Sequence, residues 1–473
     1  MSNETQQAFV DRVKKSKEDE FLKLSLQRAQ TRFRDGRQAR SEELGNIEEW
    51  KERASQIRRH TIENLDSYLE QFATNVRKLG GHVHFAPTDS DALDYIKKVM
   101  KEKDTHSIVK SKSMVSEEMH LNEALEEIGI RMVETDLGEY IIQLAGEKPS
   151  HIIVPAIHKN KEQVAELFSK VAGEELPADP EKLTAFARQK LRQEYLKAEV
   201  GITGCNFAVA ESGSFVLVTN EGNARMSTSF PKTHIVIMGM ERIVPTWEDL
   251  DVVVSLLPRF ATGQKITSYV TAFTGPKREE DVDGPEELHV VIVDNGRSEI
   301  LGTKYQEVLK CIRCGACINV CPVYRHIGGH AYGSVYPGPI GAVLSPLLGE
   351  KDEHKELPFA STLCYACSEV CPVKIPLAEL LVEHRKDYVD SKKTAWAERI
   401  AMKGFGMVMG NQGLYEKAIK AARPLSSPFT KNEYFDKSLP VLKNWTDVKD
   451  LPRPAKETFR DWWNKEGKDA GKQ

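Results

Sequence analysis

The segment Cys311-Ile-Arg-Cys314-Gly-Ala-Cys317-Ile-Asn-Val-Cys321-Pro322 carries four of the eight cysteines of the chain. Its spacing, C-x2-C-x2-C-x3-C-P, is that of bacterial ferredoxins, in which the fourth cysteine ligates the other of two [4Fe-4S] clusters. Three thiolates spaced three residues apart lie on one tight turn and can hold three corners of a cubane cluster, and the proline stiffens the exit of that turn. A zinc ribbon needs two separated C-x-x-C pairs instead. The spacing therefore predicts iron-sulfur clusters.

A second run, Cys364-Tyr-Ala-Cys367-Ser-Glu-Val-Cys371-Pro372, repeats the pattern after an intervening segment of 42 residues. When the two runs are aligned, Ser361 stands where the opening cysteine of the second run is expected. Under the crossed rule, the ligands of one cluster are Cys311, Cys314, Cys317 and Cys371, and those of the other are Cys321, Cys364 and Cys367. The second cluster is thus predicted to have three cysteine ligands.

The fourth ligand position of this second cluster is left open by the spacing. It can be filled by Ser361, by a histidine such as His326 or His330, by water or by a side chain of a partner protein. Alternatively, the cluster is a [3Fe-4S] cluster that lacks this iron.

Composition limits the class of protein. With 473 residues, 40% hydrophobic and 29% charged, the chain is long enough for two or three soluble domains. It has no apolar run long enough for a membrane span, and its N-terminus lacks the features of a signal peptide. Seven of the eight cysteines lie in the two runs, which favours metal binding in a reducing compartment over disulfides. We therefore expect a cytoplasmic protein.

Hydrophobic periodicity divides the chain into four regions. Residues 1–79 are expected to form two long charged helices, the second ended by Gly80-Gly81. Residues 80–296 alternate strands and helices, which predicts an α/β domain with a parallel sheet and an antiparallel addition. Residues 297–390 are expected to be an α-helical ferredoxin domain with two clusters, and residues 391–473 a C-terminal arm. Among the expected elements are a strand at 152–155, a helix at 116–127 capped by Ser116, and helices at 299–310 and 377–388.

The C-terminal arm is basic, with 17 Lys and Arg against 10 Asp and Glu in residues 391–473, although the net charge of the whole chain is -4. It either wraps its own core with a solvated basic face or docks an acidic partner. The sequence pI of 6.4 argues against nucleic-acid binding.

Two segments of the α/β region suggest chemistry. Lys110-Ser-Lys112 joins a strand end to a helix start, which is either an anion or ligand site or an exposed basic turn. Glu211 lies beside Gly213 in a predicted tight turn, where it is either an acid/base or nucleophilic carboxylate or a residue that orders the turn. Cys205, outside the two runs, is expected to be a small buried residue.

The segments Lys110-Ser-Lys-Ser-Met, Glu134-Thr-Asp136-Leu-Gly-Glu139 and Thr203-Gly-Cys-Asn-Phe-Ala-Val-Ala-Glu-Ser-Gly, with the two cysteine runs, resemble the lactate utilization protein B family over nearly the whole chain. The resemblance implies an α/β domain similar to the formyltetrahydrofolate cyclo-ligase and CoA-transferase-like fold, fused to a ferredoxin domain. It also implies that the seven cysteines are cluster ligands, and that the protein acts with two others in oxidising L-lactate to pyruvate.

These observations predict an electron-transfer subunit of a multi-protein lactate-oxidising system. Iron-sulfur clusters carry single electrons, whereas lactate oxidation removes two, and the chain has no Rossmann, Walker A or flavin signature. The two-electron acceptor is therefore expected on a partner, and whether this chain is itself an enzyme stays open. The alternative is a self-sufficient enzyme that binds a phosphorylated or CoA-type ligand at Lys110 and Lys112, with structural or redox-sensing clusters.

Overall fold

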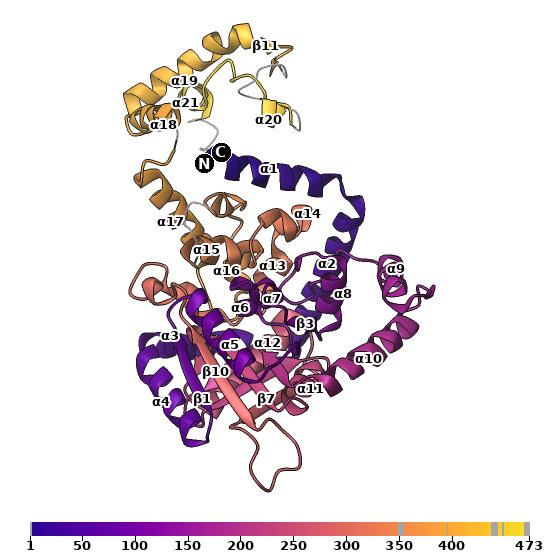
Figure 1. Cartoon of the computed structure of the whole chain (residues 1–473). Helices are drawn as coiled ribbons and strands as arrows, with labels where there is room; N and C mark the ends of the chain where they lie inside the picture. The colour runs from indigo at the N-terminus through magenta and orange to yellow at the C-terminus, as the bar shows by residue number, and fades with distance from the viewer. Residues whose placement is uncertain (1, 349–353, 395, 437–442, 447–448, 468–473) are drawn as a thin grey trace. The chain divides into compact units, whose positions relative to one another are not determined.

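The computed structural model describes residues 2–348, 354–394, 396–436, 443–446 and 449–467 (Figure 1). The chain divides into two compact units, Met1–Lys386 and Asp387–Gln473. Within the described ranges, no helix combines the length and the apolar character needed to cross a membrane.

The N-terminal region is helical, as expected, but it contains four helices and not two. They are α1 (Ser2–Glu18), α2 (Glu20–Leu44), α3 (Ile47–Glu63) and α4 (Leu65–Lys78). The breaks have local causes. The carboxylate of Asp19 accepts a hydrogen bond from the amide of Leu22 at 2.8 Å and starts a new helix. Gly45, with φ of 66°, ends α2.

The core of the first unit is a six-stranded, fully parallel sheet in the order β1-β10-β7-β4-β2-β3. The strands are β1 (His82–Ala86), β10 (Glu287–Val293), β7 (Thr233–Gly239), β4 (Val200–Thr203), β2 (Ser107–Lys110) and β3 (Arg131–Glu134). The expected parallel α/β architecture is confirmed, but β4 was not predicted. This strand has only four residues and contains Gly201, where a Cβ atom would lie 1.9 Å from the carbonyl oxygen of Ser227.

A second, four-stranded sheet provides the expected antiparallel addition, in the order β8-β5-β6-β9. Its strands are β8 (Ile243–Val244), β5 (Phe207–Val209), β6 (Ser214–Thr219) and β9 (Tyr269–Thr274). Strands β5 and β6 form a hairpin whose turn contains Gly213 in the left-handed region, with φ of 67°. Strand β8 pairs with β5 in parallel, so this sheet is mixed.

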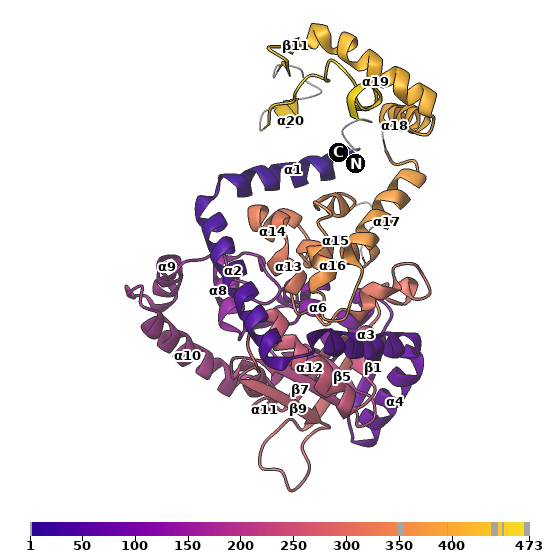
Figure 2. The same ribbon diagram turned by 180° about the vertical axis from the view of Figure 1, so that it is seen from behind.

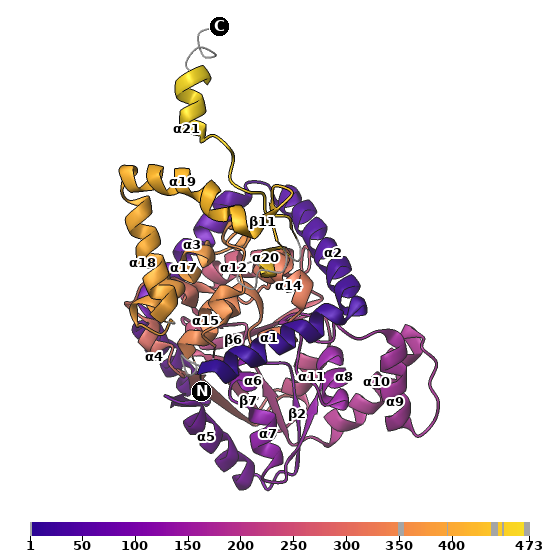
Figure 3. The ribbon, with the colours of Figure 1, turned by 90° about the horizontal axis from the view of Figure 1, so that it is seen from above.

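Helices connect and cover the strands. They are α5 (Asp89–Glu102), α6 (Met114–Glu118), α7 (Leu121–Glu126), α8 (Leu137–Ala145), α9 (Lys161–Ala172), α10 (Pro180–Lys197), α11 (Asn223–Ser229) and α12 (Trp247–Ala261). Helices α9 and α10 pair beside α8 (Figure 3). The single helix expected at 116–127 is wrong, because His120 adopts φ of 52° and separates α6 from α7. The N-cap of α6 is Ser113, not Ser116.

The strand expected at 152–155 is also wrong. His151 is buried, and its Nδ1 accepts hydrogen bonds from the amides of Ile153 at 3.0 Å and Val154 at 3.3 Å. These bonds turn the backbone, so the segment forms bends and turns. Its side chains pack against the first cysteine run, where Ile153 approaches Gly315.

The cysteine-bearing region is built from short helices. They are the 3₁₀ segments η2 (Ser298–Ile300), η3 (Gln306–Lys310), η4 (His330–Tyr332) and η5 (Leu357–Phe359), and the helices α13 (Ala316–Val320), α14 (Pro322–Ile327), α15 (Gly338–Leu348), α16 (Ala366–Val370) and α17 (Leu377–Asp390). The helix expected at 299–310 is wrong, because Gly302, with φ of 71°, separates η2 from η3. The helix expected at 377–388 is confirmed as α17.

The N-terminal helices hold this region in place. Helix α2 runs alongside α13 and α14 (Figure 2). The buried Nε2 of Gln30 donates hydrogen bonds to the carbonyl oxygens of Ile318 at 2.9 Å and Cys321 at 3.3 Å.

The second unit contains α18 (Trp396–Met409), α19 (Gln412–Ser426), η6 (Ser427–Phe429), β11 (Thr430–Lys431), β12 (Tyr434–Phe435), α20 (Lys443–Thr446), α21 (Phe459–Trp462) and η7 (Trp463–Gly467).

Lys110, at the end of β2, is a fully buried cation in the core. Its Nζ lies 2.8 Å from carboxylate oxygens of both Glu117 and Glu134 and 3.0 Å from the hydroxyl of Ser116. Burial disfavours the ammonium form, but the two carboxylates outweigh burial and raise the pKa of Lys110. The charge of Lys110 is therefore part of the packing of the fold.

We expect Lys110→Ala to lower the free energy of unfolding by about 3–5 kcal/mol, because it leaves the buried carboxylate of Glu134 and the partly buried carboxylate of Glu117 without their cation. The control Lys98→Ala removes a lysine that is 70% exposed, and it should change the value by less than about 0.5 kcal/mol. Urea unfolding followed by circular dichroism measures both. Equal midpoints for the two variants would contradict the assignment of Lys110 to the core.

Candidate functional site

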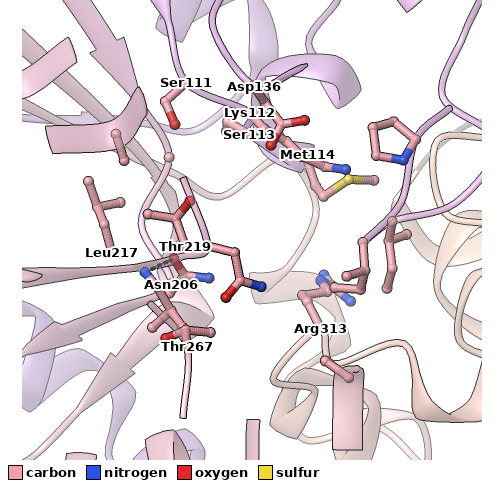
Figure 4. A pocket seen from close by; sticks show the side chains of 18 of the residues that line it. Ser111, Lys112, Ser113, Met114, Asp136, Asn206, Leu217, Thr219, Thr267 and Arg313 are labelled. Carbon is pink, nitrogen blue, oxygen red and sulfur yellow. Dashed lines mark hydrogen bonds between the residues drawn. The ribbon is translucent and has the colours of Figure 1, made fainter. Parts of the chain in front are cut away.

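A cavity of about 450 Å³ lies at the carboxyl edge of the main sheet (Figure 4). Ser111, Lys112 and Ser113 reach it directly after β2, and Gly204, Cys205 and Asn206 directly after β4. Strands β2 and β4 are neighbours, but the chain leaves them in opposite directions across the sheet, toward β3 and toward β7. Such a topological switch point is where open α/β sheets bind ligands. The position therefore marks the cavity as a candidate ligand site.

The wall of the cavity combines charged, polar and apolar groups. Its cations are Lys112, Arg242 and Arg313, and its carboxylates are Asp136, Glu221 and Glu241. Amide and hydroxyl groups come from Asn206, Thr219, Asn220, Asn223 and Thr267, and apolar surface from Met114, Ile152, Val154, Leu217 and Leu257. A largely apolar wall with a few converging polar groups is typical of small-molecule sites. In Figure 4, Arg313 points into the cavity from the wall opposite Asn206 and Thr219.

Two cations in this wall carry buried donors. Arg313 Nη2 lies 3.2 Å from a carboxylate oxygen of Glu241, and its guanidinium lies 4.6 Å from the ring centroid of Tyr336. Its Nη1 is buried and has no hydrogen-bond partner among the residues that the structure describes. Lys112 Nζ lies 3.0 Å from a carboxylate oxygen of Glu139, but it too makes no hydrogen bond within the described part of the chain. Both donors are available to a ligand.

Two of the acidic groups of the cavity, Asp136 and Glu221, lie close together. Burial, together with the neighbouring carboxylate of Asp136, raises the pKa of Glu221 to about 7. Glu221 Oε2 accepts a hydrogen bond from the amide of Leu137 at 3.1 Å, at the start of α8. Near neutral pH this carboxyl group can therefore donate as well as accept hydrogen bonds.

A second cavity adjoins the first and is lined by Cys311, Cys314, Cys317 and Cys371. The rest of its wall is mainly apolar: Ile312, Ile340, Val373, Ile375 and Leu377. Ile152 and Arg313 line both cavities. The side chain of Arg313 thus borders the sheet cavity on one side and the four cysteines on the other.

The other three cysteines of the runs form a second group. Burial raises the pKa of the Cys321 and Cys367 thiols. The neighbouring thiol of Cys364 raises both values further, and Cys321 also raises the pKa of Cys367, so the three side chains lie near one another. Cys364 is exposed, whereas Cys321 and Cys367 are buried. The two groups lie next to each other, because the Cys367 thiol of the second group contributes to the raised pKa of Cys317 in the first group.

Both groups suit thiolate-held clusters. The four thiols of the first group face one small cavity with an apolar wall, and the amide of Arg313 lies 3.4 Å from Cys311 Sγ. In the described ranges, no three His, Cys, Asp or Glu side chains converge as they would on a single metal ion. The membership of the two groups follows the crossed spacing rule, and the role of each cysteine as a ligand stays a prediction.

The structure separates the two lysines of the predicted anion site. Lys110 is buried between two carboxylates and does not line the cavity, whereas Lys112 does. Glu211 is exposed, lies outside the lining of the cavity, and accepts a hydrogen bond from the amide of Trp247 at 2.8 Å. This geometry favours a role for Glu211 in ordering the start of α12. Cys205 is partly buried and lines the cavity, and burial raises the pKa of its thiol to about 12.

Sequence reasoning missed several residues of the site. Arg313 lies inside the first cysteine run, and a positive charge among the cysteines was the feature of the sequence that could have identified it as a site residue. Arg242 and Glu241 follow β7, and the carboxyl ends of parallel strands meet at one edge of a sheet. Tyr332 gave no signal, yet its buried hydroxyl lies beside Cys321 and has no other partner among the described residues.

Three family profiles match consecutive parts of the chain. Residues 69–293 match the LUD domain, and residues 307–375 match a 4Fe-4S dicluster domain. Residues 384–468 match the C-terminal region of lactate utilisation protein B. The chain therefore combines a LUD α/β domain with a domain that carries iron-sulfur clusters. A crystal structure of a DUF162 family protein from Deinococcus radiodurans aligns with 48% of this chain and 98% of its own, at 15% identity and a TM-score of 0.29.

Curated relatives match over almost the whole chain. Lactate utilization protein B of Oceanobacillus iheyensis is 55% identical over 462 residues, which is 98% of this chain and 97% of the relative. The protein of the same name from Anoxybacillus flavithermus is 57% identical over 461 residues, or 97% and 98% of the two chains. With these extents of identity, the chain belongs to the lactate utilization protein B family.

Proposed function

We propose that this protein is the iron-sulfur electron-transfer subunit of a multi-protein system that oxidises L-lactate to pyruvate. The observation that carries the proposal is a 4Fe-4S dicluster domain in a chain 55% identical to a protein named for lactate utilization. The bound clusters supply one-electron transfer, and lactate oxidation removes two electrons. The group that takes the first electron pair therefore belongs to a partner, and this chain carries the electrons away one at a time.

The cysteine groups suggest where electrons enter or leave. The proposed ligands of the first cluster are Cys311, Cys314, Cys317 and Cys371, three of them buried. The basic residues Arg58 and Arg242 lie beside Cys311, and Lys310 lies near Cys371. Positive charge near a cluster favours its reduced form and raises its potential. The proposed ligands of the second cluster include the exposed Cys364, flanked by the exposed Tyr365. The second cluster thus offers the exchange point with a partner protein.

The two cysteine loops repeat the same backbone path, which supports Ser361 as the position of the missing ligand. Arg313 and Leu363 both adopt left-handed conformations, with φ of 58° and 52°, and so do Gly315 and Tyr365, with φ of 72° and 65°. The amide of Leu363 donates to Ser361 Oγ at 3.1 Å, just as the amide of Arg313 donates to Cys311 Sγ. Ser361 therefore occupies the position in the second loop that Cys311 occupies in the first.

The two histidine candidates for the fourth ligand are less suitable. His330 is exposed, and its Nε2 is engaged by the carbonyl oxygen of Lys148 at 2.6 Å. His326 is exposed on α14. We propose that the second cluster has three cysteine ligands and a weakly held or open fourth position at Ser361.

We expect Ser361→Cys to complete this ligand set. The wild-type protein, prepared anaerobically and mildly oxidised, should give the electron paramagnetic resonance signal of a [3Fe-4S] cluster, and the variant should give little of it, because a fourth thiolate retains the labile iron. Thr362→Cys adds a thiol one residue further along, at an exposed position, and should leave the wild-type signal unchanged. Identical spectra for wild type and Ser361→Cys would mean that another group already fills the position.

The first ligand set is tested by Cys314→Ala, with Cys205→Ala as the matched control. Cys314 lies in the four-cysteine cavity, and Cys205 stands outside both runs. We expect the first variant to lose up to about four iron atoms per chain, and the control to keep the wild-type content. Iron and sulfide analysis of anaerobic preparations gives the answer. Full iron content in Cys314→Ala would exclude Cys314 as a ligand.

The function itself is tested by mixing the anaerobic, cluster-loaded protein with the other proteins of its lactate-utilization system and adding L-lactate. We expect its clusters to become reduced only when those proteins are present, as bleaching of visible absorbance and a reduced-cluster resonance signal would show. Reduction by L-lactate in the purified protein alone would instead support a self-sufficient enzyme. Clusters that stay oxidised in the complete mixture would contradict the proposed electron-transfer role.

The C-terminal unit suits contact with a partner. Helix α18 buries none of its residues within the described part of this unit, and it exposes Trp396, Ile400 and Phe405. Residues 391–473 also carry the excess of positive charge noted above. A basic surface with exposed aromatic groups favours an acidic partner.

The cytoplasmic location stays a prediction, which is based on the clustered cysteines and the reducing compartment that they favour.

A further inference from the structure

The ligand cavity of the main sheet and the four-cysteine cavity share a wall made by Ile152 and Arg313. Arg313 lies in the loop between Cys311 and Cys314, so its backbone belongs to the cysteine loop while its guanidinium faces the sheet cavity. Nothing in the electron-transfer role requires a cavity of about 450 Å³ at this place. A ligand in the cavity would contact the same arginine that borders the first cluster.

Two donors without a hydrogen bond indicate the charge of that ligand. Arg313 Nη1 is buried and has no hydrogen-bond partner in the described structure, and Lys112 Nζ makes no hydrogen bond there although it forms an ion pair with Glu139 at 3.0 Å. A charged donor held away from water without an acceptor is unfavourable, so a ligand that supplies an acceptor is stabilised. Carboxylate and phosphate oxygens are the acceptors that best match a guanidinium. The nearby Glu241 is shared between Arg297, at 2.8 Å, and Arg313 Nη2, at 3.2 Å, so it neutralises Arg313 only in part and leaves Nη1 without an acceptor. The basic wall thus retains capacity for an added anionic group.

The remainder of the wall indicates the body of the ligand. The cavity is far larger than a three-carbon acid, and cavities of about 300–1,000 Å³ generally hold larger organic molecules. Asp136, Glu221 and Asn206 present hydrogen-bonding groups on other parts of the wall. Carboxylates there disfavour a second anionic group and suit hydroxyl donors.

We infer that this cavity binds a hydroxylated organic anion, whose carboxylate or phosphate group pairs with Arg313 and Lys112, and that its binding lowers the reduction potential of the cluster held by Cys311, Cys314, Cys317 and Cys371. The added negative charge beside the cluster partly cancels the field of Arg313, so it disfavours the extra electron of the reduced form. Occupancy of the α/β domain is thereby coupled to electron transfer.

The coupling is reciprocal. If the anion lowers the potential, it must bind the oxidised protein more tightly than the reduced protein by the corresponding factor. A tenfold difference in affinity corresponds to about 59 mV for a one-electron couple. Reduction of the cluster would then promote release of the ligand, which gives the α/β domain a redox-dependent affinity.

Anaerobic calorimetry and potentiometric titration of the cluster-loaded protein test the inference. The probes are ribose 5-phosphate for a phosphate ligand, gluconate for a carboxylate ligand, and ribose as the neutral control. We expect at least one of the two anions to bind with a Kd below about 1 mM and to lower the reduction potential of the first cluster. The size of the shift should correspond to at least threefold tighter binding of the anion to the oxidised protein than to the reduced protein. Ribose should do neither.

Three variants locate the effect. Arg313→Gln removes the shared charge and should weaken binding of the anion at least tenfold, so an anion concentration that shifts the potential of the wild type should shift that of the variant much less. Because Arg313 lies in the cysteine loop, Lys112→Gln serves as the second variant: it removes a cation outside that loop and should also weaken binding about tenfold. Arg325→Gln, on α14 and outside the lining of the cavity, should bind as the wild type does.

The inference is overturned if neither anion binds, if ribose binds as well as ribose 5-phosphate, or if binding leaves the potential unchanged. Equal weakening in Arg325→Gln and Lys112→Gln would also overturn it, because the effect would then be one of general surface charge. Calorimetric binding does not depend on lactate oxidation, so these outcomes are distinct from a failure of the proposed electron-transfer role.

Discussion

A buried ionic network joins the cysteine loops to the α/β domain. Arg297, almost fully buried, donates to Glu118 and Glu241 at 2.8 Å, and Tyr336 donates its hydroxyl proton to Glu118 at 2.7 Å. Glu241 also pairs with Arg313 at 3.2 Å. Burial alone would raise the pKa of Glu241, but Arg297 and Arg313 hold it down at about 2, so the carboxylate stays charged. Loss of one partner from such a network generally costs about 3–5 kcal/mol.

This network gives the site its geometry. Glu241 follows β7, and Glu118 ends α6, so both carboxylates belong to the carboxyl edge of the main sheet. Arg313 and Tyr336 come from the cysteine-bearing region. Since the ion pairs cross from one region to the other, the cysteine loop is held against the edge where an open α/β sheet binds its ligands. The LUD domain and the cluster domain therefore form one continuous site within the first unit.

The sequence predicted the parts of this site that depend on local spacing. Two cysteine runs were sufficient for the dicluster domain, and alternating strands and helices were sufficient for the parallel sheet. The parts that depend on contacts between distant residues were not accessible. Strand β4 was missed because four residues with a glycine give no periodic signal. The bend at 152–155 depends on hydrogen bonds to His151, and the role of Arg313 depends on Glu241, 72 residues away.

The proposed first cluster lies at the wall of the sheet cavity, held by four cysteines next to Arg313. Its position can be measured by diffraction at the iron absorption edge, from crystals grown anaerobically. We expect two iron-containing peaks, one among the Sγ atoms of Cys311, Cys314, Cys317 and Cys371 and bordered by Arg313, and the other near Cys321, Cys364 and Cys367. A single peak, or a first peak ligated by Cys321 in place of Cys371, would contradict this ligand assignment.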